Sequence, residues 1–294
     1  MKKIYITGIC GLLGSAIAKE LSGKYEICGV DIVNMDIPNC EVRQFDLTDK
    51  EQLKNSIREY KPDVVIHTAA TINVDRCEIE REETHKLNVE VTENIADICG
   101  EDEIKMIYVS TDAVYDGEKS GLYEEEDVVN PINYYGQTKL DGELAVRKIK
   151  DGLVLRTNIY GVNLQDKKSF GEWIVSALKE NQELNMFTDI MFSPILVNEL
   201  AVIMDKCIEK DISGIYHACG TGSISKYDFG ILVKEIFGIQ TGKIHSSTSD
   251  IMKFTAKRSK NMGMSNAKLR ELLNIHISTP EESIRRFKEL YNNK

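Results

Sequence analysis

Three glycines stand three residues apart near the amino terminus, at Gly8, Gly11 and Gly14. The strand-like run Lys3–Thr7 precedes them, and Ser15–Leu21, with helical spacing of apolar residues, follows them. Gly8 permits a tight turn, Gly11 lets a ligand approach the backbone, and Gly14 lets the helix pack closely on the strand. This arrangement predicts the first unit of a parallel α/β sheet, with amide groups at the helix start that can hold phosphates.

The next predicted strand ends in an acidic residue, Asp31. A carboxylate at that place can accept hydrogen bonds from both hydroxyls of a ribose. The glycines are therefore interpreted as a dinucleotide-binding turn rather than as a strand-to-helix turn without a ligand. The carboxylate would repel the additional phosphate of NADP(H), so NAD(H) is favoured and NADP(H) is left open. Cys10 is interpreted as a small filler rather than a redox-sensitive thiol. The predicted cofactor-binding residues of this region are Gly8, Cys10, Gly11, Leu12, Leu13, Gly14 and Asp31.

The first half of the chain alternates β-branched runs with amphipathic stretches, as βαβ units do. One helix is predicted from Thr48 as cap with Glu51 three residues on, and it ends before Pro62. The fold class is therefore α/β, with a doubly wound parallel sheet of the Rossmann type. The predicted strands are Lys3–Thr7, Glu26–Ile32, Val42–Leu47, Asp63–Thr68, Lys105–Thr111 and Gly152–Thr157.

The second half is less regular and predicts a smaller α/β substrate-binding lobe. We expect a dinucleotide-binding domain over residues 1–161, with the chain returning to the sheet within 195–220, and a lobe built mainly from 162–294. Thr279, Pro280 and Glu282 form a complete helix start. The predicted helices are Ser169–Asn181, Val197–Lys210, Lys226–Phe237 and Pro280–Tyr291, and the predicted returning strand is Gly214–Ala218.

Composition narrows the class of partner. The formal net charge of −10 argues against a nucleic-acid partner. Seven scattered cysteines without a CxxC pair fit reduced thiols, and with five dispersed histidines they predict no metal site. The amino terminus lacks the pattern of a signal peptide, and no apolar run is long enough to span a membrane, so a cytoplasmic protein is expected.

Tyr135 and Lys139 lie four residues apart on one face of a predicted helix. An ammonium beside a tyrosine stabilises the phenolate, so the hydroxyl can act as acid or base near neutral pH. The pair alone is common on helix surfaces. Thr111 strengthens it, because a hydroxyl at the carboxyl end of a parallel strand lies where ligands bind and can polarise a carbonyl.

Five motifs follow one another along the chain: TGxxGxxG at the amino terminus, HTAA (His67–Ala70), STDAVYDG (Ser110–Gly117), YYGQTKLDGE (Tyr134–Glu143) and LRTNIYG (Leu155–Gly161). In that order they resemble the extended short-chain dehydrogenase/reductases, and within them most closely the dTDP-4-dehydrorhamnose reductase family and its sugar-nucleotide relatives.

The resemblance implies that Thr111, Tyr135 and Lys139 form a catalytic triad, with Lys139 also holding the nicotinamide ribose. It further implies that Ala69 and Ala70 line the cofactor and that Asp46 and Leu47 face the adenine. For these last four residues the alternative is a buried strand end.

The resemblance implies reduction of a nucleoside-diphosphate 4-keto-6-deoxy sugar, the nucleotide sugar being the expected partner. Ala113 follows Asp112 where 4,6-dehydratases carry a glutamate, which argues against dehydration. A sugar-nucleotide 4-epimerase and a non-catalytic dinucleotide-binding regulatory subunit stay open, as does a homodimer. Four cations in the second half form either a phosphate clamp or a solvated loop, namely Lys253, Lys257, Arg258 and Lys260.

Overall fold

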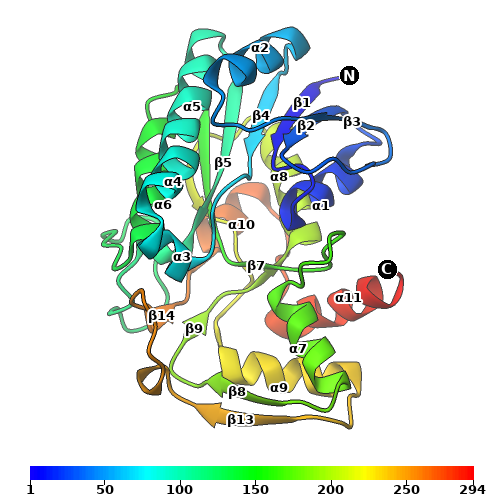
Figure 1. Ribbon diagram of the computed structural model, residues 1–294, viewed down its shortest axis with the longest axis vertical. Helices are drawn as coiled ribbons and strands as arrows, with labels where there is room; N and C mark the ends of the chain where they lie inside the picture. The colour runs from blue at the N-terminus through cyan, green and yellow to red at the C-terminus, as the bar shows by residue number, and fades with distance from the viewer.

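A seven-stranded parallel sheet forms the centre of the computed structural model, which describes all residues, 1–294 (Figure 1). The strand order is β11-β6-β5-β4-β1-β2-β3. The direction of winding reverses between β1 and β4, and ligands bind outside the carboxyl ends of strands at such a point. The sheet confirms the predicted doubly wound fold. Its strands are β1 (Lys3–Thr7), β2 (Glu26–Asp31), β3 (Cys40–Gln44), β4 (Val64–His67), β5 (Lys105–Thr111), β6 (Gly152–Thr157) and β11 (Gly214–His217).

Helices cover both faces of this sheet (Figure 1). One face carries α1 (Leu12–Leu21) and α8 (Val197–Glu209), with α10 (Ala267–Leu273) beside them. The other carries α2 (Lys50–Tyr60), α5 (Val91–Glu101) and α6 (Tyr134–Val146). Because the central strands lie between two helical layers, their side chains are buried on both faces, as in the all-buried β4.

Most predicted elements agree with the structure to within two residues, and β1, β5, β6 and α9 (Lys226–Phe237) agree at both ends. The predicted strand Val42–Leu47 was wrong in its bounds, since β3 covers Cys40–Gln44. The carboxylate of Asp46 accepts hydrogen bonds from the amide and hydroxyl of Thr48 at 2.9 and 2.8 Å, so the chain turns at Leu47 and Thr48 instead of continuing the strand.

Two helix starts tested the capping predictions, and one was wrong. The N-cap of α2 is Asp49, whose Oδ1 accepts from the amide of Gln52 at 3.0 Å. The hydroxyl of Thr48, the predicted cap, instead donates a hydrogen bond to the Asp46 carboxylate. At α11 (Pro280–Asn292) the predicted capping box of Thr279 and Glu282 is confirmed.

The second lobe lies below the sheet in Figure 1 and has an aromatic core. Tyr160, Phe229 and Phe287 are fully buried there, with the Tyr160 ring edge-on to both others. Both α8 and β11 belong to the sheet layers, so the chain re-enters them from the lobe; the boundary at residue 161 stays a prediction. The lobe contains α7 (Phe170–Lys179), β8 (Glu183–Phe187), β9 (Met191–Phe192), α9, β12 (Ile224–Ser225), β13 (Lys243–Ser247), η3 (Ser249–Ile251), β14 (Asn261–Met262) and α11.

Short elements that the sequence did not predict lie near the carboxyl edge of the sheet. They include a π-helical turn, η1, and a 3-10 turn, η2. No helix in the structure combines the length and apolarity needed to cross a membrane. The short elements are α3 (Val74–Ile79), α4 (Arg81–His85), η1 (Lys86–Glu90), η2 (Asp112–Val114), β7 (Ile159–Tyr160) and β10 (Ile195–Leu196).

Candidate active site

The turn between β1 and α1 follows a path that requires glycine. Gly8 has a φ of +71°, in the left-handed region. A Cβ on Gly14 would lie 2.2 Å from the Gly8 carbonyl oxygen, and one on Gly8 would lie 3.0 Å from the Ala69 backbone. The N-cap of α1, Gly11, offers no side chain to the first amides of the helix, which begins at Leu12. These amides and the positive end of the helix dipole fit the phosphates of a dinucleotide.

Asp31 turns its carboxylate toward this glycine turn. Its Oδ2 accepts from the amide of Cys10 at 3.1 Å, and its Oδ1 accepts from the amide of Val33 at 3.1 Å. The Cys10 thiol is buried and donates to the Val33 carbonyl at 3.3 Å. Burial, and secondarily Asp31, raises the pKa of that thiol to about 11. A thiol protonated at neutral pH agrees with a packing role.

Ala69 and Ala70 lie just after β4, separated from it by Thr68, at the carboxyl edge of the sheet, and both are half-buried. The Ala69 backbone lies against Gly8, and its amide donates to the Thr7 hydroxyl at 3.4 Å. The structure thus brings the predicted Ala69 and the glycine turn together.

Asp46 and Leu47 are placed differently. The Asp46 carboxylate closes the turn with Thr48, and Leu47 is buried in the core between the sheet and α2. The Leu47 side chain is therefore used in packing. A contact between this pair and the adenine stays a prediction.

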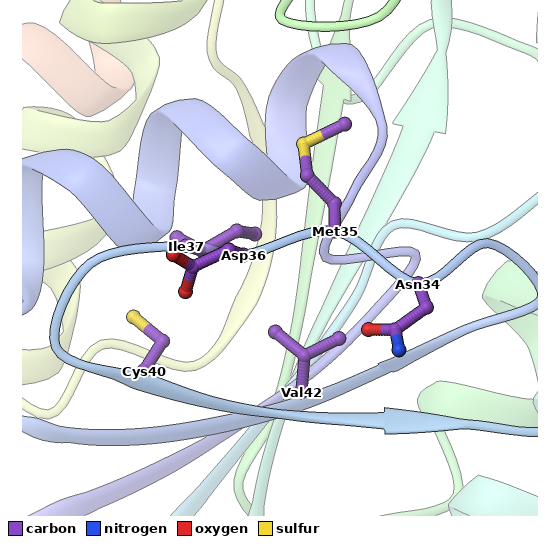
Figure 2. Close-up of a pocket in the computed structure, with 6 residues that line it drawn as sticks. All are labelled: Asn34, Met35, Asp36, Ile37, Cys40 and Val42. Carbon is purple, nitrogen blue, oxygen red and sulfur yellow. The ribbon is translucent and has the colours of Figure 1, made fainter.

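A cavity of about 400 Å³ lies beside the β2–β3 connection (Figure 2). The Val33 carbonyl, in the same connection, is bonded to Cys10 of the glycine turn. The connection from Ile32 to Asn39 contains no lysine or arginine. None of the predicted catalytic residues lines the cavity. Its lining residues are Asn34, Met35, Asp36, Ile37, Cys40 and Val42.

Thr111 and Tyr135 come from different elements and meet at the carboxyl end of β5. The side chain of Asn133 caps α6 by accepting from the amide of Gly136 at 2.9 Å. A Cβ on Gly136 would lie 2.2 Å from the carbonyl oxygen of Ala113, so glycine lets α6 approach η2 closely. This approach brings the Tyr135 phenol close enough to the Thr111 hydroxyl for that hydroxyl to affect the pKa of the phenol.

The pKa values of Tyr135 and Lys139 are both shifted by burial. Burial raises the pKa of Tyr135, although the nearby Thr111 hydroxyl lowers it in part. Burial lowers the pKa of Lys139 to about 7, against the raising effect of Glu143. The Lys139 ammonium lies 4.1 Å from the centroid of the Tyr108 ring. Lys139 is not among the groups that shift the phenol pKa, so the expected lowering by Lys139 is not observed, and the phenol stays protonated, as a proton donor must be.

The buried side-chain amide of Asn88, which the sequence analysis did not identify, contacts helix α6. Asn88, in the π-helical turn η1, accepts from the Thr71 amide at 2.8 Å and donates to the Thr71 carbonyl at 3.0 Å. It also donates to the Thr138 hydroxyl at 3.1 Å, between Tyr135 and Lys139. Such turns occur frequently at functional sites.

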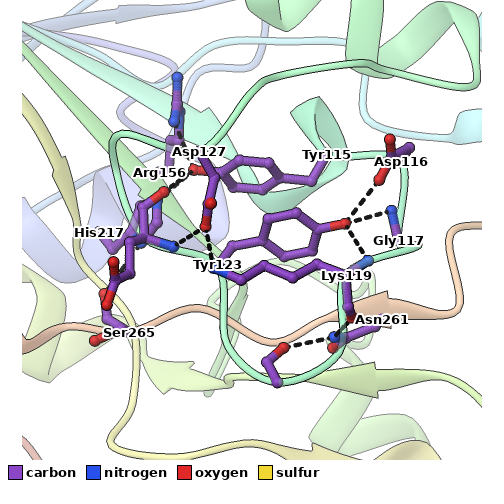
Figure 3. A network of polar contacts seen from close by, with 12 residues as sticks. Tyr115, Asp116, Gly117, Lys119, Tyr123, Asp127, Arg156, His217, Asn261 and Ser265 are labelled. Carbon is purple, nitrogen blue, oxygen red and sulfur yellow. Dashed lines mark hydrogen bonds and ion pairs between the residues drawn. The ribbon is translucent and has the colours of Figure 1, made fainter.

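A buried polar network holds the strands beside the site, and Figure 3 shows the part of it around Tyr115, Arg156 and His217. Arg156 on β6 pairs with Glu143 on α6 at 2.7 Å, with side chains only 4% and 1% exposed. Arg156 also donates to the Tyr115 hydroxyl at 2.7 Å. The same hydroxyl lies 2.7 Å from Nε2 of His217 on β11. Ser110, next to Thr111, donates to Glu143 at 2.5 Å. The network fixes β5, β6, β11 and α6 relative to one another.

The charges of the basic run, Lys253 to Lys260, are partly neutralised by carboxylates of the protein. Arg258 donates to Asp75 on α3 at 2.7 Å. Lys260 forms an ion pair with Asp250 at 2.9 Å. Two of its four cations thus already have carboxylate partners, which weakens the prediction of a phosphate clamp there.

The sheet, the glycine turn and the Thr111–Tyr135–Lys139 cluster define an oxidoreductase of the extended short-chain dehydrogenase/reductase class that uses a nicotinamide dinucleotide. Residues 1–292 match the family model described as RmlD substrate binding domain, and the chain belongs to that family. The match confirms the family that the motifs predicted.

Individual relatives agree with this assignment. The chain is 34% identical over 248 residues to the probable low-salt glycan biosynthesis reductase of Haloferax volcanii, covering 83% of each protein. It is 31% identical over 300 residues to methionine adenosyltransferase 2 subunit beta of Rattus norvegicus, covering 95% of this chain and 84% of the relative. The crystal structure of dTDP-4-dehydrorhamnose reductase from Bacillus anthracis in complex with NADP matches with a TM-score of 0.86 at 26% identity and 100% coverage of both chains.

Proposed function

We propose that the protein reduces a 4-keto-6-deoxy sugar carried on a nucleoside diphosphate, the type of reaction that the name of the Bacillus anthracis neighbour describes. The observation that carries this proposal is the close approach of the start of α6, which carries Tyr135, to the end of β5 and η2, which carry Thr111, at the carboxyl edge of the sheet beside the glycine turn. A proton donor beside a dinucleotide site is what reduction of a carbonyl requires.

Tyr135 donates the proton to the carbonyl oxygen. The Thr111 hydroxyl, which donates to Asp112 in this structure, turns to donate a hydrogen bond to the same oxygen as negative charge develops on it. Lys139, with a pKa of about 7, can exchange protons near neutral pH and so restore the proton that Tyr135 loses. The buried pair of Arg156 and Glu143 keeps these elements fixed while the charge moves.

The residues of the glycine turn fit a nicotinamide dinucleotide, which when bound supplies the hydride that is added to the carbonyl carbon. The amides at the start of α1 would hold its phosphates, and Lys139 would hold the nicotinamide ribose. Asp31 would accept from the adenosine ribose hydroxyls, and with no cation between Ile32 and Asn39 to pair with a further phosphate, NADH is favoured over NADPH.

A second candidate is a non-catalytic regulatory subunit, because methionine adenosyltransferase 2 subunit beta is 31% identical to the chain over 95% of its length. The presence of Thr111, Tyr135 and Lys139 in one cluster favours catalysis. A 4-epimerase would use the same cluster but would regenerate its cofactor in each cycle.

Turnover assays separate these candidates. The purified protein is mixed with NADH or NADPH and a panel of keto and hydroxy sugar nucleotides, and loss of reduced cofactor and the sugar products are measured. We expect stoichiometric oxidation with a 4-keto-6-deoxy substrate. Conversion of one hydroxy sugar into its epimer without net oxidation would indicate an epimerase, and absence of any turnover would overturn the proposal.

A further inference from the structure

Lys226, the first residue of α9, holds its ammonium against two aromatic rings of the second lobe. Its Nζ lies 3.3 Å from the centroid of the Phe192 ring and 4.5 Å from that of Phe170. Its backbone is fixed, since its amide donates to the Ile190 carbonyl at 3.0 Å and Ser225 caps the helix. The side chain is half-buried, and its ammonium makes no hydrogen bond or ion pair within the protein.

Lys226 faces the catalytic cluster through Asp112, the residue that follows Thr111. Asp112 is 2% exposed, and its Oδ1 accepts from the Thr111 hydroxyl at 3.1 Å. Its Oδ2 accepts from the Asn158 amide group. The Asn158 carbonyl in turn accepts from the amide of Ile195, in the segment that carries Phe192.

The pKa values of the two charged residues agree with this proximity. Burial lowers the pKa of Lys226 to about 8, against the raising effect of Asp112. Burial raises the pKa of Asp112 to about 6, while the Asn158 hydrogen bond and then Lys226 lower it. Each charge is thus close enough to shift the other, and Asp112 also shifts Tyr135.

A half-buried ammonium without an acceptor in the protein must donate its hydrogen bonds to water or to a ligand. The two phenylalanine faces offset part of the cost by attracting the cation, but they accept no ordinary hydrogen bond. Two cations of the basic run, Arg258 and Lys260, differ in this respect because they already bind carboxylates. Lys226 therefore has the unused donor capacity that a ligand-binding residue needs.

We propose that Lys226 is a substrate-binding residue that donates a hydrogen bond to an oxygen of the sugar ring or its hydroxyl groups, opposite Thr111 and Tyr135. Its ammonium lies over Phe192, and the segment that carries Phe192 is joined through Asn158 to Asp112, so Lys226 lies toward the reacting end of the ligand rather than the pyrophosphate. The adjoining phenylalanines supply the apolar wall that commonly accompanies a few polar groups in small-molecule sites. The proposal rests on the proposed sugar-nucleotide function.

The test compares Lys226→Met, Lys226→Arg and a control, Lys19→Met, on the exposed last turn of α1. Loss of one charge-assisted hydrogen bond should raise the KM for the keto sugar nucleotide about 10- to 100-fold in Lys226→Met. Lys226→Arg should recover part of the loss, and Lys19→Met should match the wild type. The Kd for NADH and the affinity for free nucleoside diphosphate should stay unchanged in all three.

Binding of dTDP-glucose, measured by calorimetry with cofactor present, distinguishes the two proposals. One outcome is that the wild type binds dTDP-glucose, Lys226→Met binds it more weakly, and no keto sugar is turned over. That outcome would overturn the proposed reaction but support the Lys226 contact. Turnover with an unchanged KM in Lys226→Met would overturn the contact alone. Weaker binding of free dTDP in that variant would place Lys226 at the pyrophosphate and also overturn it, and a wild type that neither binds nor turns over would overturn both proposals.

Discussion

Replacing Glu143 by Gln should destabilise the protein strongly, although the two side chains have nearly the same size. The Glu143 carboxylate accepts from Ser110 at 2.5 Å and from Nε and Nη2 of Arg156 at 2.9 and 2.7 Å. Glutamine removes the counterion of a guanidinium that is 4% exposed and turns an NH₂ group toward its donors. Removing one partner of a buried pair costs about 3–5 kcal/mol, which corresponds to a fall in Tm of about 6–20 °C.

Thermal and urea denaturation of Glu143→Gln measure this cost, with Glu93→Gln on the exposed face of α5 as the control. The control should unfold within about 0.5 kcal/mol of the wild type. Adding Arg156→Met to Glu143→Gln should recover part of the stability, because it removes the unpaired charge. A loss below about 1 kcal/mol in Glu143→Gln would show that the pair does not hold this part of the sheet together.

Three further changes test the catalytic and cofactor assignments. Tyr135→Phe keeps the ring but removes the proton donor, so kcat should fall roughly 10²–10⁴-fold while fluorescence titration shows unchanged NADH affinity; an unimpaired rate would contradict the role. Lys139→Met should weaken both NADH binding and turnover, and a variant with both intact would reduce Lys139 to a packing residue. The wild type should show a higher kcat/KM with NADH than with NADPH, and Asp31→Ser should narrow the difference; a preference of the wild type for NADPH would show that Asp31 does not face the ribose.

The elements that were predicted most accurately from the sequence are those whose bounds are set by neighbouring residues. β5 and β6 are apolar on both faces, and α11 carries Thr279 and Glu282 in a complete capping box, so their bounds follow from neighbouring residues. The start of α2 was mistaken because two acceptors, Thr48 and Asp49, stand side by side. Which of them caps depends on whether Asp46 occupies the Thr48 hydroxyl.

Other features depend on contacts between distant segments. The two-residue strand β9 exists because β12 and β14 pair with it, and no local pattern announces such a strand. The predicted triad residues could be named from a strand end, a helical spacing and a family resemblance. Asn88 and Lys226 could not be predicted, because Asn88 is recognised only by its bonds to Thr71 and Thr138, and the role proposed for Lys226 depends on its contacts with two phenylalanine rings.

Transfer of deuterium from NADH deuterated on the transferred position tests the central claim most directly. The wild type is mixed in a single turnover with a nucleoside-diphosphate 4-keto-6-deoxy sugar, and the product is examined by mass spectrometry and NMR. The account predicts one deuterium on C4 of the sugar, and no detectable transfer in Tyr135→Phe on the same time scale. A wild-type sugar that binds but leaves NADH unoxidised, or a product without deuterium on C4, would contradict it.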